Sequence, residues 1–323
     1  MRISLGRARK SLVPAVDLMI SPLAYLCAFI LKVVRRVGVQ RLPRTKAMLI
    51  RAGSFPIQKH YYEPSFDNES LRTLLSAERS LPGIDWNVAE QLQLLKSFSS
   101  QDELATIPRY QGEGYEYYLD NKSFESGDAE YWYNLIRLKK PKRIIEIGSG
   151  ASTRMARRAL VANVDDDPTY TCDHILIEPY EQDWLEELGV TVIRDTVENC
   201  DIHMFEELDA GDILFIDSSH MIRPRGDVLF EYLEVLPRLK VGVIVHIHDI
   251  FSPRDYPAEW VVDEVRLWNE QYLLEAFLTS NKDWKVIGAL NLLQHHHFDE
   301  LREKCLFLTE ERQPGSFYIE KVR

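Results

Sequence analysis

The segment Arg143-Ile-Ile-Glu-Ile-Gly-Ser-Gly-Ala-Ser-Thr153 decides the fold of this chain. Its first half is a short apolar run, interrupted by Glu146, of the kind that a buried strand shows. Gly148 and Gly150 follow directly, and a helix-compatible segment then covers residues 152–161. A glycine turn between a strand and a helix lets backbone N–H groups approach a ligand closely. This stretch therefore predicts a strand, a ligand-binding turn and a helix.

Further apolar runs follow at the spacing of an alternating α/β chain. The expected second to fifth strands are Ile175–Glu178, Val190–Ile193, Asp212–Asp217 and Val241–Ile247. The helix-like stretches between them are Glu181–Leu188, Met204–Leu208 and Val228–Leu236. This alternation predicts a parallel sheet with right-handed crossovers, in which ligands bind beyond the carboxyl ends of the strands. Glu178, which closes the second strand, can accept hydrogen bonds from ribose hydroxyls.

The glycine turn lacks the third glycine of a dinucleotide-binding fingerprint, because Thr153 stands at that position. Glu-x-Gly-x-Gly after a first strand is instead typical of class I S-adenosylmethionine (SAM)-dependent methyltransferases, which the chain resembles over residues 125–323. The resemblance implies a doubly wound α/β Rossmann-like sheet of seven strands, in the order 3-2-1-4-5-7-6, with the last strand antiparallel. The flanking segments match this pattern: a helix over Asp128–Arg137, a long helix over Glu259–Leu278, and strands at Trp284–Leu290 and Ser316–Lys321.

The same resemblance implies that SAM lies over the glycine turn. Glu178 would hold the ribose, Glu146 would lie beneath the turn near the amino-acid end of the donor, and Val197 would face adenine. The residues assigned to the cofactor are Glu146, Gly148, Ser149, Gly150, Ser152, Thr153, Glu178, Val197 and Asp217.

Polar side chains stand where the fourth and fifth strands end. Asp217-Ser-Ser-His220 follows one strand, and His246-Ile-His248-Asp249 closes the next. Methyl transfer to a hydroxyl needs an aligned donor and acceptor and removal of the acceptor's proton. Neutral imidazole is the usual base for such a proton near pH 7. These two clusters are therefore the candidate catalytic groups.

The clusters resemble those of metal-dependent O-methyltransferases of the catechol and macrolide-sugar types. The resemblance implies that Asp217, His248 and Asp249 hold a divalent metal, and that His220 is the base, with Asp217 beside it. The family has an oxygen ligand at position 248, and magnesium prefers oxygen whereas imidazole suits manganese or zinc. Three alternatives stay open: another metal than magnesium, a His248 that is not a ligand, or no metal. His246 is expected on the same strand face as His248, and one of the two is expected to form a hydrogen bond inside the protein.

The charge is concentrated near the amino terminus. Residues 1–51 carry eleven Lys and Arg against Asp17 alone, whereas the remainder is acidic and the total is −11. An acidic body disfavours nucleic-acid partners. Residues 12–34 are mostly apolar with basic flanks on both sides, which favours a helix in the membrane interface over a spanning helix or a signal peptide. The alternative is a helix packed on the body or on a second subunit of an oligomer.

Three segments are expected: a basic apolar anchor (1–51), a helical cap on the substrate side (52–124) and the methyltransferase core (125–323). Aromatic clusters in the cap suit sugar stacking, but most of them are expected to be core. The triplet His295–His297 is expected in a solvated loop. Four scattered cysteines, Cys27, Cys172, Cys200 and Cys305, fit a reducing compartment, which indicates a cytoplasmic enzyme at the inner face of a membrane.

The expected reaction is O-methylation of a hydroxyl on a sugar, a glycoconjugate or a small metabolite. Phrases such as Leu81-Pro-Gly-Ile-Asp85 resemble those of uncharacterised bacterial methyltransferases and name no substrate. Three alternatives stay open. They are an NAD(P)-dependent oxidoreductase on a related sheet, a catalytically silent SAM-binding or scaffold protein, and an N- or C-methyltransferase without a metal.

Overall fold

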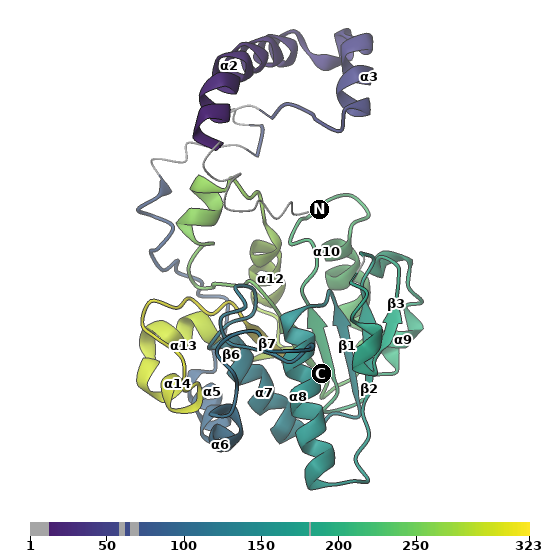
Figure 1. Cartoon of the computed structure of the whole chain (residues 1–323), viewed down its shortest axis with the longest axis vertical. Coiled ribbons are helices and arrows are strands. Elements are labelled where there is room, and N and C mark those ends of the chain that lie inside the picture. The colour runs from purple at the N-terminus through teal and green to yellow at the C-terminus, as the bar shows by residue number, and fades with distance from the viewer. Residues whose placement is uncertain (1–12, 58–61, 65–70, 181) are drawn as a thin grey trace. The chain divides into compact units, whose positions relative to one another are not determined.

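The structure, a computed structural model, describes residues 13–57, 62–64, 71–180 and 182–323 (Figure 1). The chain divides into two compact units, residues 1–69 and 70–323. The segment 52–124 is thus shared between the two units. The first unit holds helix α2 (Val13–Val37), the 3-10 turn η1 (Val39–Arg41) and helix α3 (Pro43–Arg51). The second unit holds the sheet and every other element.

Helix α2 covers the apolar segment expected near the amino terminus, except for Leu12, which lies outside the described residues. Most of its apolar side chains are exposed, with Met19 80% and Tyr25 77% accessible, whereas Val34 is buried. By length and composition the helix could cross a membrane. Arg35 and Arg36 stand in its last turn. The basic residues expected to flank it on the other side, in segment 1–12, lie outside the described residues.

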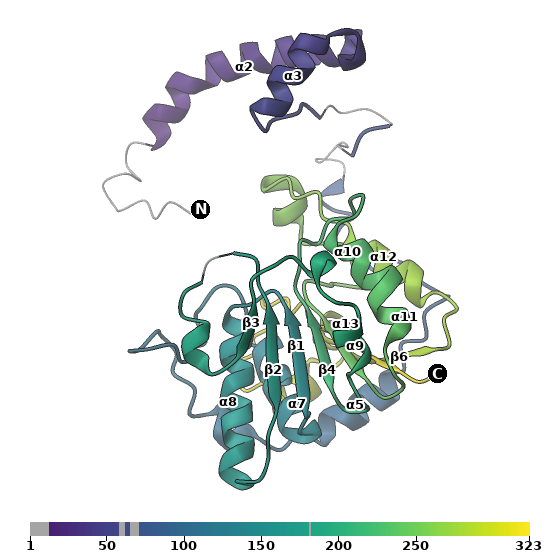
Figure 2. The same ribbon diagram turned by 90° about the vertical axis from the view of Figure 1, so that its right-hand side faces the viewer.

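The second unit is built on a seven-stranded sheet in the order β3-β2-β1-β4-β5-β7-β6, as predicted (Figure 2). Its strands are β1 (Arg143–Ile147), β2 (Asp173–Ile177), β3 (Thr191–Ile193), β4 (Ile213–Ile216), β5 (Ile244–Ile247), β6 (Trp284–Ala289) and β7 (Phe317–Lys321). Strand β7 is antiparallel to both neighbours, β5 and β6. The first five strands are parallel, and β2, β1, β4 and β5 pair in the centre of the sheet. Helices cover both faces there, so isoleucines such as Ile145 are fully buried.

Helices and short helical turns connect the strands. In chain order they are α5 (Val88–Lys96), α6 (Gln101–Leu104), α7 (Asp128–Lys139), α8 (Ala151–Asp166), η2 (Glu186–Leu188), η3 (Val197–Asn199), α9 (His203–Glu206), α10 (Asp227–Phe230), η4 (Glu231–Val235), α11 (Leu236–Arg238), η5 (Glu259–Asp263), α12 (Glu270–Leu278), α13 (Leu290–His296) and α14 (Phe298–Lys304). Helices α7 and α8 lie side by side (Figure 2). Trp132 of α7 packs on Phe215 of β4, which fixes this helix against the centre of the sheet.

The prediction of one long helix over 259–278 is wrong. The π-helical turn η5 ends at Asp263, and α12 begins only at Glu270. Between them Val265 has φ +55°, a left-handed conformation that an α-helix does not contain. The backbone N–H groups of Asn269 and Glu270 donate to the carbonyl of His220 instead of to a preceding helical turn. A long-range contact therefore interrupts a locally helical pattern.

Two smaller predictions also need correction. Of the helix expected over 181–188, only the turn Glu186–Leu188 is helical, and Glu181 lies outside the described residues. The first two residues of the triplet His295–His297 are exposed, as expected, but they belong to the last turn of α13 rather than to a loop. Each forms a side-chain contact with a residue far along the chain, His295 with Gln313 and His296 with Glu78.

Candidate active site at the carboxyl ends of the strands

The glycine turn lies directly against the end of β4. Gly148 has φ +87°, and its N–H donates to Ile177 O of β2 (3.0 Å). A Cβ at this position would lie 2.2 Å from the backbone oxygen of Asp217, so the close approach of the two strand ends requires glycine. A Cβ on Gly150 would meet no described atom within 4 Å. Gly148 is thus required by the fold, whereas Gly150 borders open space at the start of α8.

Glu146 lies beneath the turn and is completely buried. One of its carboxylate oxygens is 2.7 Å from Nε2 of His174 on β2. The other accepts hydrogen bonds from Thr153 Oγ1 (2.8 Å) and, more weakly, Ser152 Oγ (3.4 Å) in the first turn of α8. Because a buried carboxylate is stable only when it is well paired, this network ties β1, β2 and α8 together behind the turn.

Glu178 presents its carboxylate where β2 ends. Its Oε2 accepts a hydrogen bond from Ser149 Oγ (2.7 Å) in the glycine turn, and its Oε1 accepts one from the N–H of Tyr180 (2.9 Å). Val197 is buried in the turn η3, which follows β3. The residues predicted to hold the cofactor come from β1 and the turn that follows it, from the first turn of α8, and from the segments that directly follow β2, β3 and β4.

Asp217, His220 and Asp249 converge at the ends of β4 and β5. Each offers one ligand atom, and these atoms lie within 4.8 Å of one another. His220 Nε2 is 3.2 Å from Asp217 Oδ1 and 3.6 Å from Asp249 Oδ2. His220 and Asp249 both have φ +58°, a conformation that is uncommon outside glycine and that costs about 1–3 kcal/mol. The two carboxylates offer oxygen ligands of the kind that a divalent cation takes, and a histidine as a further ligand would favour manganese or zinc over magnesium.

The other ring nitrogen of His220 contacts a residue that the sequence did not reveal. Nδ1 is 2.8 Å from Oε2 of Glu270, a carboxylate with no exposed surface. Burial lowers the pKa of His220, but its hydrogen bonds with Asp217 and Glu270 outweigh burial and raise that pKa well above its ordinary value. The pKa of Asp217 is lowered, because its hydrogen bond to His220 and the charge of His248 outweigh its burial. Glu270 lies in a predicted helix, where an acidic residue ordinarily indicates a solvated face, so no sequence signal marked it.

His246 lies on β5 and His248 directly follows that strand, and the contacts of both differ from those of His220. His248 Nε2 is 3.6 Å from Asp249 Oδ1, and its Nδ1 is 3.5 Å from Ser316 Oγ. His220 rather than His248 completes the group of close ligand atoms. The expectation that one of the two histidines forms an internal hydrogen bond is met by His248. Neither ring nitrogen of His246 has a partner among the described residues. Its ring stacks on Tyr318 (4.2 Å between centroids), and burial lowers its pKa well below the ordinary value.

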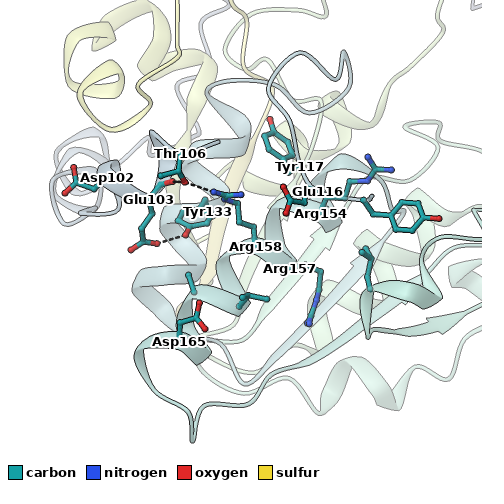
Figure 3. Close-up of a pocket in the computed structure, with 14 residues that line it drawn as sticks. Asp102, Glu103, Thr106, Glu116, Tyr117, Tyr133, Arg154, Arg157, Arg158 and Asp165 are labelled. Atoms are coloured by element: carbon teal, nitrogen blue, oxygen red, sulfur yellow. Dashed lines mark hydrogen bonds between the residues drawn. The ribbon is translucent and has the colours of Figure 1, made fainter. Parts of the chain in front are cut away.

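A cavity of about 790 Å³ lies along α8 (Figure 3). Its polar lining comes from α6, α7, α8 and the segment 106–117, and includes Arg154, Arg157 and Arg158. Arg154 stands one helical turn after Gly150. Its guanidinium lies 4.1 Å from the centroid of the Trp184 ring. Of the described residues that line this cavity, none belongs to the cluster of Asp217, His220 and Asp249. The cavity and the candidate catalytic cluster are therefore separate sets of residues.

Comparison with known proteins agrees with the topology of the sheet. A family model described as "Methyltransferase domain" matches residues 145–250, from β1 to just past β5. An uncharacterised protein of Archaeoglobus fulgidus is 30% identical over 171 residues, which are 48% of this chain and 74% of that protein. This chain belongs to the methyltransferase-domain family. The matched region contains the glycine turn, Glu178 and the cluster at the ends of β4 and β5.

Solved structures with a similar arrangement include methyltransferases. The O-methyltransferase of Bacillus cereus, in complex with SAH, is 12% identical, with 79% of this chain and 96% of that chain covered at a TM-score of 0.36. The O-methyltransferase TomG of Streptomyces achromogenes, in complex with SAM, is 13% identical, with 80% and 100% covered at a TM-score of 0.36. Because these TM-scores are low, the assignment to the methyltransferase-domain family rests on the strand order and the match to the family model.

Proposed function

We propose that this methyltransferase transfers the methyl group of SAM to a hydroxyl oxygen. The observation that supports the proposal is the position of the glycine turn, which packs against Asp217 and so lies beside the cluster of Asp217, His220 and Asp249. The turn proposed to bind the methyl donor and the three side chains proposed to act on the acceptor are then neighbours on one edge of the sheet. In-line methyl transfer to oxygen requires this juxtaposition.

The cofactor fits the residues around the turn. A Cβ on Gly150 would enter open space. The Glu178 carboxylate stands at the end of β2, where it can accept hydrogen bonds from ribose hydroxyls. Ser149, which now bonds Glu178, would orient that carboxylate. When bound, SAM supplies an electrophilic methyl group on a sulfonium. The task of the chain is to hold the acceptor oxygen in line with that group and to remove its proton.

His220 is the proposed base, acting through Nε2, and Asp217 and Asp249 are the proposed ligands of a divalent metal. Burial lowers the pKa of His220, but its hydrogen bonds with Asp217 and Glu270 raise it further, so the base role needs the negative charge that faces Nε2 to be offset. A divalent cation between Asp217 and Asp249 would do so and would lower the pKa of the acceptor hydroxyl. His248, beside Asp249, is a further proposed ligand.

The proposed acceptor is a hydroxyl of a sugar, a glycoconjugate or a small metabolite. We place the enzyme in the cytoplasm, in contact with the inner face of a membrane through residues 12–34. The support is helix α2, whose apolar side chains are mostly exposed and whose last turn carries Arg35 and Arg36. Apolar burial and attraction of basic residues to anionic lipid both favour such contact.

Calorimetry with the purified full-length chain tests the cofactor assignment. SAM and its demethylated product SAH should bind and NAD should not, because Thr153, at the position of the third fingerprint glycine, is buried on Glu146. Glu178→Ala should weaken SAM binding about tenfold or more, through loss of a charge-assisted hydrogen bond. His220→Ala is the matched control and should bind SAM as the wild type does. Binding of NAD, or of neither methyl donor nor product, would contradict the proposal.

Mass spectrometry tests the reaction. A strain without the gene should accumulate a hydroxyl compound lighter by one methylene than its product in the wild type. The purified chain and SAM should convert that compound, and His220→Ala should slow the conversion about 10²- to 10⁴-fold, the usual contribution of a general base. Equal turnover by the wild type and His220→Ala would exclude His220 as the base.

A further inference from the structure

The imidazole of His220 is held by a segment about fifty residues further along the chain. The carbonyl of His220 accepts hydrogen bonds from the N–H groups of Asn269 (3.0 Å) and Glu270 (3.2 Å). The Trp268 ring packs on the imidazole, with 4.3 Å between centroids. These contacts occur where the predicted helix 259–278 is interrupted, so the interruption places three consecutive residues around one histidine.

The Glu270 side chain then determines which ring nitrogen faces the cluster. Its Oε2 is 2.8 Å from His220 Nδ1, and its Oε1 accepts a hydrogen bond from the Tyr232 hydroxyl (3.2 Å). A carboxylate only accepts hydrogen bonds, so Nδ1 carries a proton and donates it. Nε2 is left to face Asp217 and Asp249, at 3.2 and 3.6 Å. Because Glu270 has no exposed surface, water does not compete for this contact.

We propose that Glu270 is a positioning residue of the methyl-transfer site, which holds Nδ1–H of His220 so that Nε2 is presented to the acceptor hydroxyl. This inference rests on the proposed function. In the step, the acceptor oxygen forms a bond to the methyl carbon while the sulfur–methyl bond breaks and leaves its electron pair on sulfur. Nε2 first gives to solvent the proton that it shares with Asp217, and the hydroxyl proton then moves to Nε2. The resulting imidazolium is stabilised by the Glu270 carboxylate on its far side. The proton then leaves Nε2 for solvent.

Glu270→Gln preserves the shape of the side chain but replaces the carboxylate by a weaker, neutral partner. Glu275→Gln is the matched control, because Glu275 is buried on the same helix but contacts Arg79 and Ser252 rather than His220. Proton NMR of the full-length chain should show a strongly downfield signal from Nδ1–H of His220, identified by its loss in His220→Ala. The signal should vanish or move upfield in Glu270→Gln and persist in Glu275→Gln. A signal unchanged in Glu270→Gln would overturn the inference.

Turnover separates positioning from a purely structural role. With the acceptor identified as above, Glu270→Gln should lower kcat about 10- to 100-fold, as removal of a carboxylate behind a functional histidine does, with KM unchanged. Glu275→Gln should keep the wild-type kcat. A rise in KM alone, or an equal loss of kcat in both variants, would overturn the inference.

SAH calorimetry on the same proteins distinguishes the two ways of failing. If the wild type does not bind SAH, the proposed function fails whatever the NMR shows. If the wild type and Glu270→Gln bind SAH equally while kcat and the Nδ1–H signal are unchanged by the substitution, only the role of Glu270 fails. Equal SAH binding with loss of both the signal and kcat supports the inference.

Discussion

Glu231 is a single residue whose environment is unusual for an acid. It is completely buried in the turn η4, and its Oε2 accepts a hydrogen bond from Ser218 Oγ (3.1 Å). Its other oxygen has no hydrogen-bond partner among the described residues. Burial, followed by the charges of Glu270 and Asp227, raises the pKa of Glu231 well above its ordinary value. The folded protein therefore keeps a proton on Glu231 at a pH where the unfolded chain has lost it.

The sign of the resulting pH dependence follows from linkage. An acid with a raised pKa in the folded state destabilises the fold increasingly as pH rises above its unfolded value of 4.5. Glu231→Gln removes this titration, so the variant should be more stable than the wild type at neutral and alkaline pH, by about 1–3 kcal/mol. Urea denaturation over a pH series measures the difference. Parallel curves for the two proteins would contradict the raised pKa.

The closeness of the Asp217 and Asp249 carboxylates leads to a prediction about metal removal. Manganese should raise the melting temperature of the wild-type chain, and EDTA should reverse the rise, because binding to the folded state alone stabilises it. Asp249→Asn should abolish the manganese effect. Asp209→Asn, which alters an exposed carboxylate paired with Lys240, is the control and should respond as the wild type does. A manganese effect of the same size in Asp249→Asn would place the ion elsewhere.

At the scale of elements, the two glycines of the turn between β1 and α8 are expected to have different roles. Gly148 has φ +87° and no room for a Cβ, whereas a Cβ on Gly150 would enter open space. Gly148→Ala should therefore destabilise the protein by about 2 kcal/mol or more, through backbone strain and a clash with Asp217 O. Gly150→Ala should leave stability within about 0.5 kcal/mol of the wild type but weaken SAH binding. Thermal melting and calorimetry on both variants check this, and the reverse pattern would refute the assignment.

At the scale of the whole molecule, the net charge and the exposed apolar side chains are unevenly distributed. The basic residues gather in positions 1–51, and α2 carries exposed apolar residues such as Leu26 and Phe29. The double substitution Leu26→Asp and Phe29→Asp should abolish co-flotation of the full-length chain with vesicles containing anionic lipid, since each aspartate opposes apolar insertion. SAH binding should not change.

Leu233→Asp is the matched control for this experiment, because Leu233 is an exposed leucine of the sheet-containing unit. Its vesicle binding should equal that of the wild type. If the wild type itself does not float with vesicles, or if all three proteins float equally, residues 12–34 do not mediate membrane contact.

Local patterns in the sequence determined the fold and the edge of the sheet on which the site lies. The apolar run 213–216, and the run 144–147 with its single interruption at Glu146, predict strands because burial on both faces of a sheet demands apolar residues. The strand order implied by the family resemblance and the rule for carboxyl ends then predicted Glu178, Asp217 and Asp249 at the same edge of the sheet.

Tertiary structure alone decided how the site is supported. Glu270 pairs with His220 across fifty positions, and His174 pairs with Glu146 across twenty-eight. Neither pairing leaves a periodic trace in the sequence, because it depends on which elements pack together and not on local propensity. The same contacts overrode the helical pattern of 259–278, since satisfying the buried carbonyl of His220 took precedence over continuing a helix.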